Sequence, residues 1–131
     1  MLYDYFLYSS CLPPDSDASS VGGIVKQARA NNGSAGITGV LGFDGENFIQ
    51  YVEGPRAAIQ TLRAALARDD RHVNFTVLSE GADVAERAFS DWQLGYADVG
   101  DESVNLSELH AMTGDAALDY FMCHTSAMDF A

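Results

Sequence analysis

The stretch that decides the fold runs from Asn31 to Gly54 and reads NNGSAGITGVLGFDGENFIQYVEG. Apolar residues alternate on both sides of Asp44-Gly45, a dipeptide typical of a two-residue hairpin turn. The stretch therefore predicts two antiparallel strands. With a two-residue loop, the pairs across the hairpin are Phe43 with Glu46, Leu41 with Phe48, Gly39 with Gln50, and Ile37 with Val52.

One polar side chain stands on the apolar face of this hairpin. Because side chains alternate along a strand, Gln50 shares its face with Ile37, Gly39, Leu41, Phe48 and Val52. A buried amide without hydrogen-bond partners costs about 1–3 kcal/mol. The glycine expected opposite Gln50 leaves space for a group that is not a side chain. We therefore interpret this face as the lining of a ligand site.

The rest of the chain alternates between strand and helix patterns. An aromatic strand at 3–9 precedes a helix with apolar spacing over 21–28, and Pro55 opens a second helix that ends near Arg68. Two further strands are predicted near 73–79 and 88–97. The order β-α-β-β-α-β-β predicts a ferredoxin-like α+β fold, a mainly antiparallel five-stranded sheet with two helices on one face.

The second face of this sheet is not polar. Short helices are expected in the tail, near 104–112 and 115–124. We divide the chain into a ligand-binding domain, 1–98, and a C-terminal helical cap, 99–131, which covers this face or forms a dimer interface. A homo-oligomer is accordingly expected, because an uncovered apolar patch of this size is unusual on a soluble monomer. The side chains that point to this face are Tyr3, Tyr5, Leu7, Val40, Ile49 and Tyr51.

The composition and net charge exclude some classes of binding partner. The 131 residues include 19 acidic and 7 basic ones, for a net charge of −12, and we interpret the acidic excess as solvated surface. Nucleic acid and membrane surfaces are excluded as partners, because neutralising phosphates requires clustered Lys and Arg. Neither a signal peptide nor an apolar run of the ~18 residues that a membrane helix needs is visible. Cys11, Cys123 and the three histidines lack metal-ligand spacing, so we expect a cytoplasmic protein without a metal.

Two more polar side chains are candidates for ligand contacts. Tyr8 shares a face with Phe6 on the first strand, which in this topology lies centrally, beside the strand of Gln50. A phenol supplies a proton and an electron, and an amide has donor and acceptor ends that can exchange places. Taken alone, Tyr8 is better explained as a core aromatic and Asn32 as a helix-stop residue. Beside Gln50, the Tyr8 phenol becomes a stronger candidate, and the Asn32 amide could present a donor and an acceptor to the edge of a heterocycle, so both interpretations stay open at this point.

Several short motifs, in this order and spacing, together resemble the BLUF family, the sensors of blue light using FAD. The resemblance extends from Leu7 to about Tyr96. Its pieces are Leu7-Tyr8-Ser9-Ser10, Ala28-Arg29 with Asn31-Asn32, Gly36-Ile37-Thr38-Gly39, Phe48-Ile49-Gln50 with Glu53-Gly54, Asp69 with Arg71-His72, and Phe89-Ser90-Asp91-Trp92.

The resemblance implies a flavin between the two helices of a photosensory domain over 1–98. It implies that Tyr8 is the photo-oxidised phenol, Gln50 the switching amide, and Asn32 the ligand of the ring's carbonyl and imide edge. The expected cofactor is FAD, with FMN or riboflavin as alternatives. The further contacts implied are apolar walls at Ile24, Ile37, Leu41, Phe48 and Val52, neighbours of the ring or its side chain at Asp69, Arg71 and His72, and phosphate neutralisers at Lys26 and Arg29.

The implied function is a blue-light photoreceptor, not an enzyme, that relays a red-shifted state to an unidentified partner protein. Light drives an electron and a proton from Tyr8, and their return leaves Gln50 rearranged. Trp92 and Leu94 carry the output, although the family pattern has methionine where this chain has Leu94. The alternatives are a light-inactive flavin-binding or adaptor module of the same fold, and a small ferredoxin-like enzyme that uses Cys11 or His72.

Overall fold

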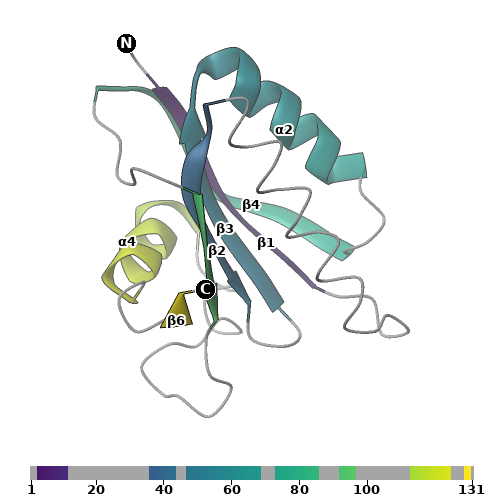
Figure 1. The fold of residues 1–131 in the computed structure, drawn as a ribbon, viewed down its shortest axis with the longest axis vertical. Helices are drawn as coiled ribbons and strands as arrows, with labels where there is room; N and C mark the ends of the chain where they lie inside the picture. Colours follow the sequence, from purple (N-terminus) through teal and green to yellow (C-terminus); the bar gives the residue numbers. More distant parts are fainter. Residues whose placement is uncertain are drawn as a thin grey trace.

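The computed structural model describes residues 3–11, 36–43, 47–68, 73–85, 92–96, 113–124 and 129–130. The helices expected over 21–28 and 104–112 lie outside these residues. Among the described residues, no helix has the length and apolar content to cross a bilayer. The described elements are β1 (Tyr3–Cys11), β2 (Thr38–Phe43), β3 (Asn47–Gly54), α2 (Arg56–Arg68), β4 (Val73–Val84), β5 (Trp92–Tyr96), α4 (Gly114–His124) and β6 (Asp129–Phe130) (Figure 1).

The described strands form one sheet in the order β4-β1-β3-β2-β5-β6. Every neighbouring pair is antiparallel except β2 and β5, which run parallel. The mainly antiparallel sheet and its helices confirm the predicted α+β class, and β1 lies beside β3 as expected. The two-residue strand β6, which pairs with β5, was not predicted.

Helices α2 and α4 lie on opposite faces of the sheet (Figure 1). We call the face under α2 the inner face and the face under α4 the outer face. Helix α2 begins directly after Pro55, whose carbonyl accepts the Ile59 N–H at 3.0 Å. The inner cluster comprises Phe6, Tyr8, Ile37, Val52 and Ile59, and the outer cluster comprises Leu7, Val40, Ile49, Tyr51, Leu78, Ala117 and Phe121.

Helix α4 buries two side chains, Ala117 and Phe121, in the outer cluster. Burying one large apolar side chain contributes about 1.5–3 kcal/mol, so Phe121 is a substantial anchor for this helix. The outer-face residues Leu7, Val40, Ile49 and Tyr51 thus pack against α4. The domain boundary at residue 98 stays a prediction.

The register of the β2–β3 hairpin differs from the expected one by two residues. Leu41, and not Gly39, is the partner of Gln50, while Phe43 is opposite Phe48. The expected pair of Phe43 with Glu46 is therefore not formed, and the Asp44-Gly45 dipeptide itself lies outside the described residues. A shift of two residues leaves every side chain on its original face, because side chains alternate with a period of two. The face assignment made for Gln50 consequently stands.

Gly39 does not open a slot beside Gln50, contrary to our expectation. It lies opposite Val52 with a φ of +151°, a conformation that favours glycine. A Cβ at this position would overlap the Tyr51 carbonyl oxygen. The glycine therefore serves the close approach of β2 to β3, and Leu41 occupies the position across from the amide.

Candidate functional site

Tyr8 and Gln50 form a buried hydrogen-bonded pair on the inner face. They are direct partners in the β1–β3 ladder, and their exposed fractions are 4% and 2%. The Gln50 Nε2 donates a hydrogen bond of 2.6 Å to the Tyr8 hydroxyl oxygen. Both members come from central strands, so the sheet itself sets their separation. The two residues, which the sequence analysis placed on neighbouring strands, are thus in direct contact.

Aromatic and aliphatic side chains exclude water from the Tyr8 ring. The ring centroid lies 5.9 Å from that of Phe6 and 5.0 Å from that of Phe75. Ile37, Val52 and Ile59 complete the inner cluster with Phe6 and Tyr8. Electrostatic interactions are stronger in such a dry environment than in water, so a change in one hydrogen bond of this pair has a larger energetic effect.

The remaining predicted contacts divide into three groups. Ile37, Leu41, Phe48 and Val52 are buried, with exposed fractions of 3% or less, on the face that carries Gln50. Trp92 and Leu94 lie on β5, where Trp92 is the register partner of Gly39 and Leu94 that of Leu41. The predicted contacts outside the described residues are Ile24, Lys26, Arg29, Asn32, Asp69, Arg71 and His72.

Ser10 adds a polar atom that sequence reasoning did not assign to the site. It is 0% exposed, and its Oγ has no hydrogen-bond partner among the described residues. Alternation along β1 puts Ser10 on the face of Tyr8, but nothing in the sequence distinguishes it from an ordinary strand serine. A buried hydroxyl without a partner costs free energy. A polar ring bound on this face would give the hydroxyl a partner, so the residues present fit a flavin.

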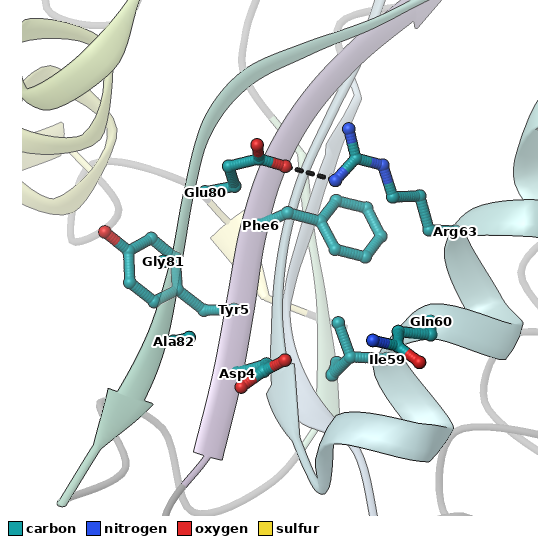
Figure 2. Close-up of a pocket in the computed structure, with 9 residues that line it drawn as sticks. All are labelled: Asp4, Tyr5, Phe6, Ile59, Gln60, Arg63, Glu80, Gly81 and Ala82. Atoms are coloured by element: carbon teal, nitrogen blue, oxygen red, sulfur yellow. Dashed lines mark hydrogen bonds and ion pairs between the residues drawn. The ribbon is translucent and has the colours of Figure 1, made fainter.

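A separate cavity of about 300 Å³ opens between α2 and the β1–β4 edge of the sheet. Figure 2 shows Phe6 and Ile59 in this cavity, with the ion pair between Arg63 and Glu80 across it. Neither Tyr8 nor Gln50 lines it. The cavity therefore lies beside the amide–phenol pair rather than at it.

The described residues contain no group of three or more His, Cys, Asp and Glu side chains that could hold a metal ion. The Cys11 thiol donates a hydrogen bond to Asn47 Oδ1, with its Sγ 3.5 Å from that oxygen. His72, the other residue of the alternative enzyme hypothesis, lies outside the described residues.

The chain is a ferredoxin-like α+β domain with a buried amide–phenol pair on the inner face of its sheet, and comparison with known proteins identifies the family. The family described as sensors of blue-light using FAD (BLUF) matches residues 3–95. The chain belongs to the BLUF family. It is accordingly a blue-light sensor domain that binds a flavin, as the sequence resemblance predicted.

Similar proteins support the same assignment. The blue light- and temperature-regulated antirepressor BluF of Escherichia coli (strain K12) is 31% identical over 72 residues, which are 55% of this chain and 18% of that protein. A bacterial light-regulated adenylyl cyclase is 26% identical, with a TM-score of 0.67 over 79% of this chain and 30% of its own. This chain thus spans less than a third of either relative.

Two solved structures match almost the whole chain. The photo-activated state of BlsA is 21% identical and has a TM-score of 0.81, with 98% of each chain covered. The dark state of BlrB, a BLUF protein, is 23% identical and has a TM-score of 0.77, with 95% of this chain and 96% of that chain covered. At these identities, the likeness shows the fold alone. BLUF domains relay their signal to partner proteins or to effector domains, of which the adenylyl cyclase is an example.

Proposed function

We propose that this chain is a blue-light photoreceptor that uses Tyr8 as its redox-active phenol and Gln50 as its switching amide. The observation that carries this proposal is the 2.6 Å hydrogen bond between the two side chains on the buried inner face. The same face carries the apolar residues Ile37, Leu41 and Val52, which are suited to hold a largely apolar ring system.

A bound flavin supplies a chromophore that absorbs blue light and, once excited, accepts an electron. With a flavin bound as electron acceptor, Tyr8 would give up an electron to it and its hydroxyl proton through Gln50, and would then recover both, so no net chemistry would take place. In the present arrangement the Gln50 Nε2 donates to the Tyr8 hydroxyl. After the amide rotates or tautomerises, Gln50 instead presents an acceptor to that hydroxyl, whose proton then points at the amide. These two arrangements are the dark and lit states of the switch.

The switch needs only a small energy difference to transmit a signal. Rearranging one or two buried hydrogen bonds changes the free energy by about 1–3 kcal/mol, which shifts a two-state equilibrium about five- to 150-fold. The strands that carry the pair also carry outer-face residues packed against α4. This arrangement supports a relay from the inner face to a partner protein rather than catalytic turnover by the chain itself.

We propose FAD as the natural cofactor, held additionally by Asn32 at the ring edge, by Ile24, Asp69, Arg71 and His72 around the ring, and by Lys26 and Arg29 at the phosphates. FMN and riboflavin share the ring and differ from FAD beyond it. A cytoplasmic location and a homo-oligomer also stay predictions. Phe48, beside Gln50 on the inner face, is proposed as a further wall of the ring site.

The test is the absorption spectrum of the purified protein before, during and after blue illumination. We expect a flavin spectrum that moves reversibly to longer wavelength, and chromatography of the released flavin will distinguish FAD, FMN and riboflavin. A bound flavin without any reversible shift would instead support the light-inactive module. A protein without flavin would contradict both accounts.

A further inference from the structure

A carboxylate is buried on the outer face, on the side of the sheet away from Gln50. Glu53 has an exposed fraction of only 1%, whereas the Glu80 side chain is 56% exposed. A carboxylate is rarely buried unless hydrogen bonds or charges compensate for its lost hydration. The interpretation of the acidic residues as solvated surface is therefore wrong for Glu53, and the burial calls for an explanation.

Glu53 belongs to a group of polar and aromatic side chains that joins β3 to β1. The Tyr51 hydroxyl donates a hydrogen bond of 3.3 Å to Glu53 Oε1. Burial and the nearby Glu53 charge raise the pKa of Tyr51, which keeps the phenol protonated as a donor. The Tyr51 ring stacks on Tyr5 of β1, with centroids 5.6 Å apart and an interplanar angle of 30°.

Tyr5 and Glu53 of this group lie in one row across the sheet, perpendicular to the strands. Tyr5 is the register partner of Glu53 on one side and of Gly81 on the other. A Cβ at Gly81 would overlap the Tyr5 ring, so the glycine provides the room in which that ring lies. Figure 2 shows Tyr5 turned away from α2 and toward Gly81. We call Tyr5, Tyr51 and Glu53 the outer clamp.

The outer clamp lies in the same β1–β3 ladder as the Tyr8–Gln50 contact. The β1–β3 ladder is regular from Asp4 to Cys11, whereas the β1–β4 ladder is interrupted at three places, one of them between Leu7 and Tyr8. The position of Tyr8 is therefore set by β3 more than by β4. A slip of two residues would keep all faces but separate the pair, and the apolar pattern alone does not oppose it.

We propose that Glu53 is a positioning residue for the Tyr8–Gln50 pair. By accepting the Tyr51 hydroxyl hydrogen bond, it fixes the Tyr51 ring on Tyr5 and so holds β3 to β1 in the register that places Gln50 on Tyr8. This inference rests on the proposed function for its photochemical consequence. Its structural consequence is the stabilisation of the β1–β3 register, which can be measured without a photocycle.

The test compares Glu53→Leu, Glu53→Gln, Tyr51→Phe and the double variant Tyr51→Phe/Glu53→Leu in the full, flavin-loaded chain. One readout is the rate of dark recovery after blue light. The other is amide hydrogen exchange at Tyr8 and Gln50 in the dark. Phe121→Leu is the matched control, because it removes volume from the outer cluster, to which Tyr51 also belongs, but leaves the Tyr51–Glu53 hydrogen bond in place. Variants are compared at equal distance below their own unfolding midpoints.

We expect Glu53→Leu and Tyr51→Phe each to speed dark recovery and to lower exchange protection by about tenfold, the effect of losing one hydrogen bond to a charged group. Glu53→Gln retains an acceptor oxygen and should stay within about twofold of the parent chain, since little of that energy is lost. The double variant should match the single ones, because both substitutions remove the same interaction. Tyr51→Phe keeps the ring, so it decides the test even if Glu53→Leu does not fold.

The proposal is overturned if all variants show the same rate of dark recovery and the same amide hydrogen exchange as Phe121→Leu. It is also overturned if Glu53→Gln changes these two quantities as much as Glu53→Leu does. If the parent chain shows no photocycle, the proposed function fails, but the exchange measurement still decides whether Glu53 holds the register.

Discussion

Leu94 of β5 lies in the same transverse row of the sheet as Gln50, with Leu41 of β2 between them. Leu41 is the register partner of both, antiparallel to Gln50 and parallel to Leu94. The row continues through Tyr8 to Val77 on β4. Leu41 thus connects the strand that carries the Gln50 amide to β5, the strand that the sequence predicts as the signal output.

Replacing Leu94 by methionine should change the lifetime of the lit state. A thioether sulfur is a weak acceptor, and a weak hydrogen bond of about 0.5–1 kcal/mol corresponds to about a two- to fivefold change in rate. Dark recovery after a blue flash measures the effect. Leu78→Met on the outer face is the control. Identical recovery and identical hydrogen exchange in β5 would show that Leu94 has no output role.

Gly39→Ala should disrupt the β2–β3 hairpin severely. The added methyl group would overlap the Tyr51 carbonyl oxygen, and the φ of +151° is unfavourable for alanine. We expect a loss of more than about 3 kcal/mol in the free energy of unfolding, beyond the usual range for a point substitution. Urea denaturation measures the loss.

Gly114→Ala is the matched control for that substitution. Gly114 also has a positive φ, +63°, but a Cβ there meets no atom within 4 Å. Only backbone strain remains, which costs about 1–2 kcal/mol. Equal losses for the two variants would mean that backbone conformation, and not the approach of β2 to β3, requires glycine at position 39.

Alkaline pH should destabilise the fold through Tyr51. Its folded-state pKa is raised above the ordinary value of 10.0 by burial and by the Glu53 charge, so the folded state holds this proton more tightly than the unfolded state. The stabilising contribution is therefore complete below pH 10 and is lost as the pH rises above it. One such proton changes the free energy of unfolding by up to about 1.4 kcal/mol per pH unit.

Urea unfolding of the parent chain and of Tyr51→Phe across this pH range measures the contribution. The variant should lose stability less steeply than the parent, because its residue 51 has no proton to release. If the free energy of unfolding of the two chains falls with pH in parallel, the Tyr51 phenol has the same pKa in the folded and unfolded states.

The amphipathic alternation of the strands could be predicted from the sequence, and their register could not. Alternation identified the face of Gln50 and the apolar outer face, and the predicted topology placed β1 centrally beside β3. Alternation says nothing about shifts of two residues, since these keep every side chain on its face. The Asp44-Gly45 signal favoured a tight turn, but Phe43 pairs with Phe48, and β3 begins at Asn47 to pair with Cys11 of β1.

The buried polar side chains differ in how well they could be predicted from the sequence. Gln50 was evident because an amide interrupts an apolar face. Ser10 and Glu53 were not: a serine is unremarkable in a strand, and one glutamate among 19 acidic residues is expected at the surface. Only the three-dimensional burial of Ser10 Oγ and of the Glu53 carboxylate distinguishes them.

The most direct test of the account is the light-minus-dark absorption spectrum of Tyr8→Phe beside that of the parent chain. Tyr3→Phe, which removes another phenol of β1, is the control. We predict a reversible red shift in the parent and in Tyr3→Phe, and bound flavin without a shift in Tyr8→Phe. A red shift that persists in Tyr8→Phe would contradict the assignment of Tyr8 and Gln50 as the photochemical pair.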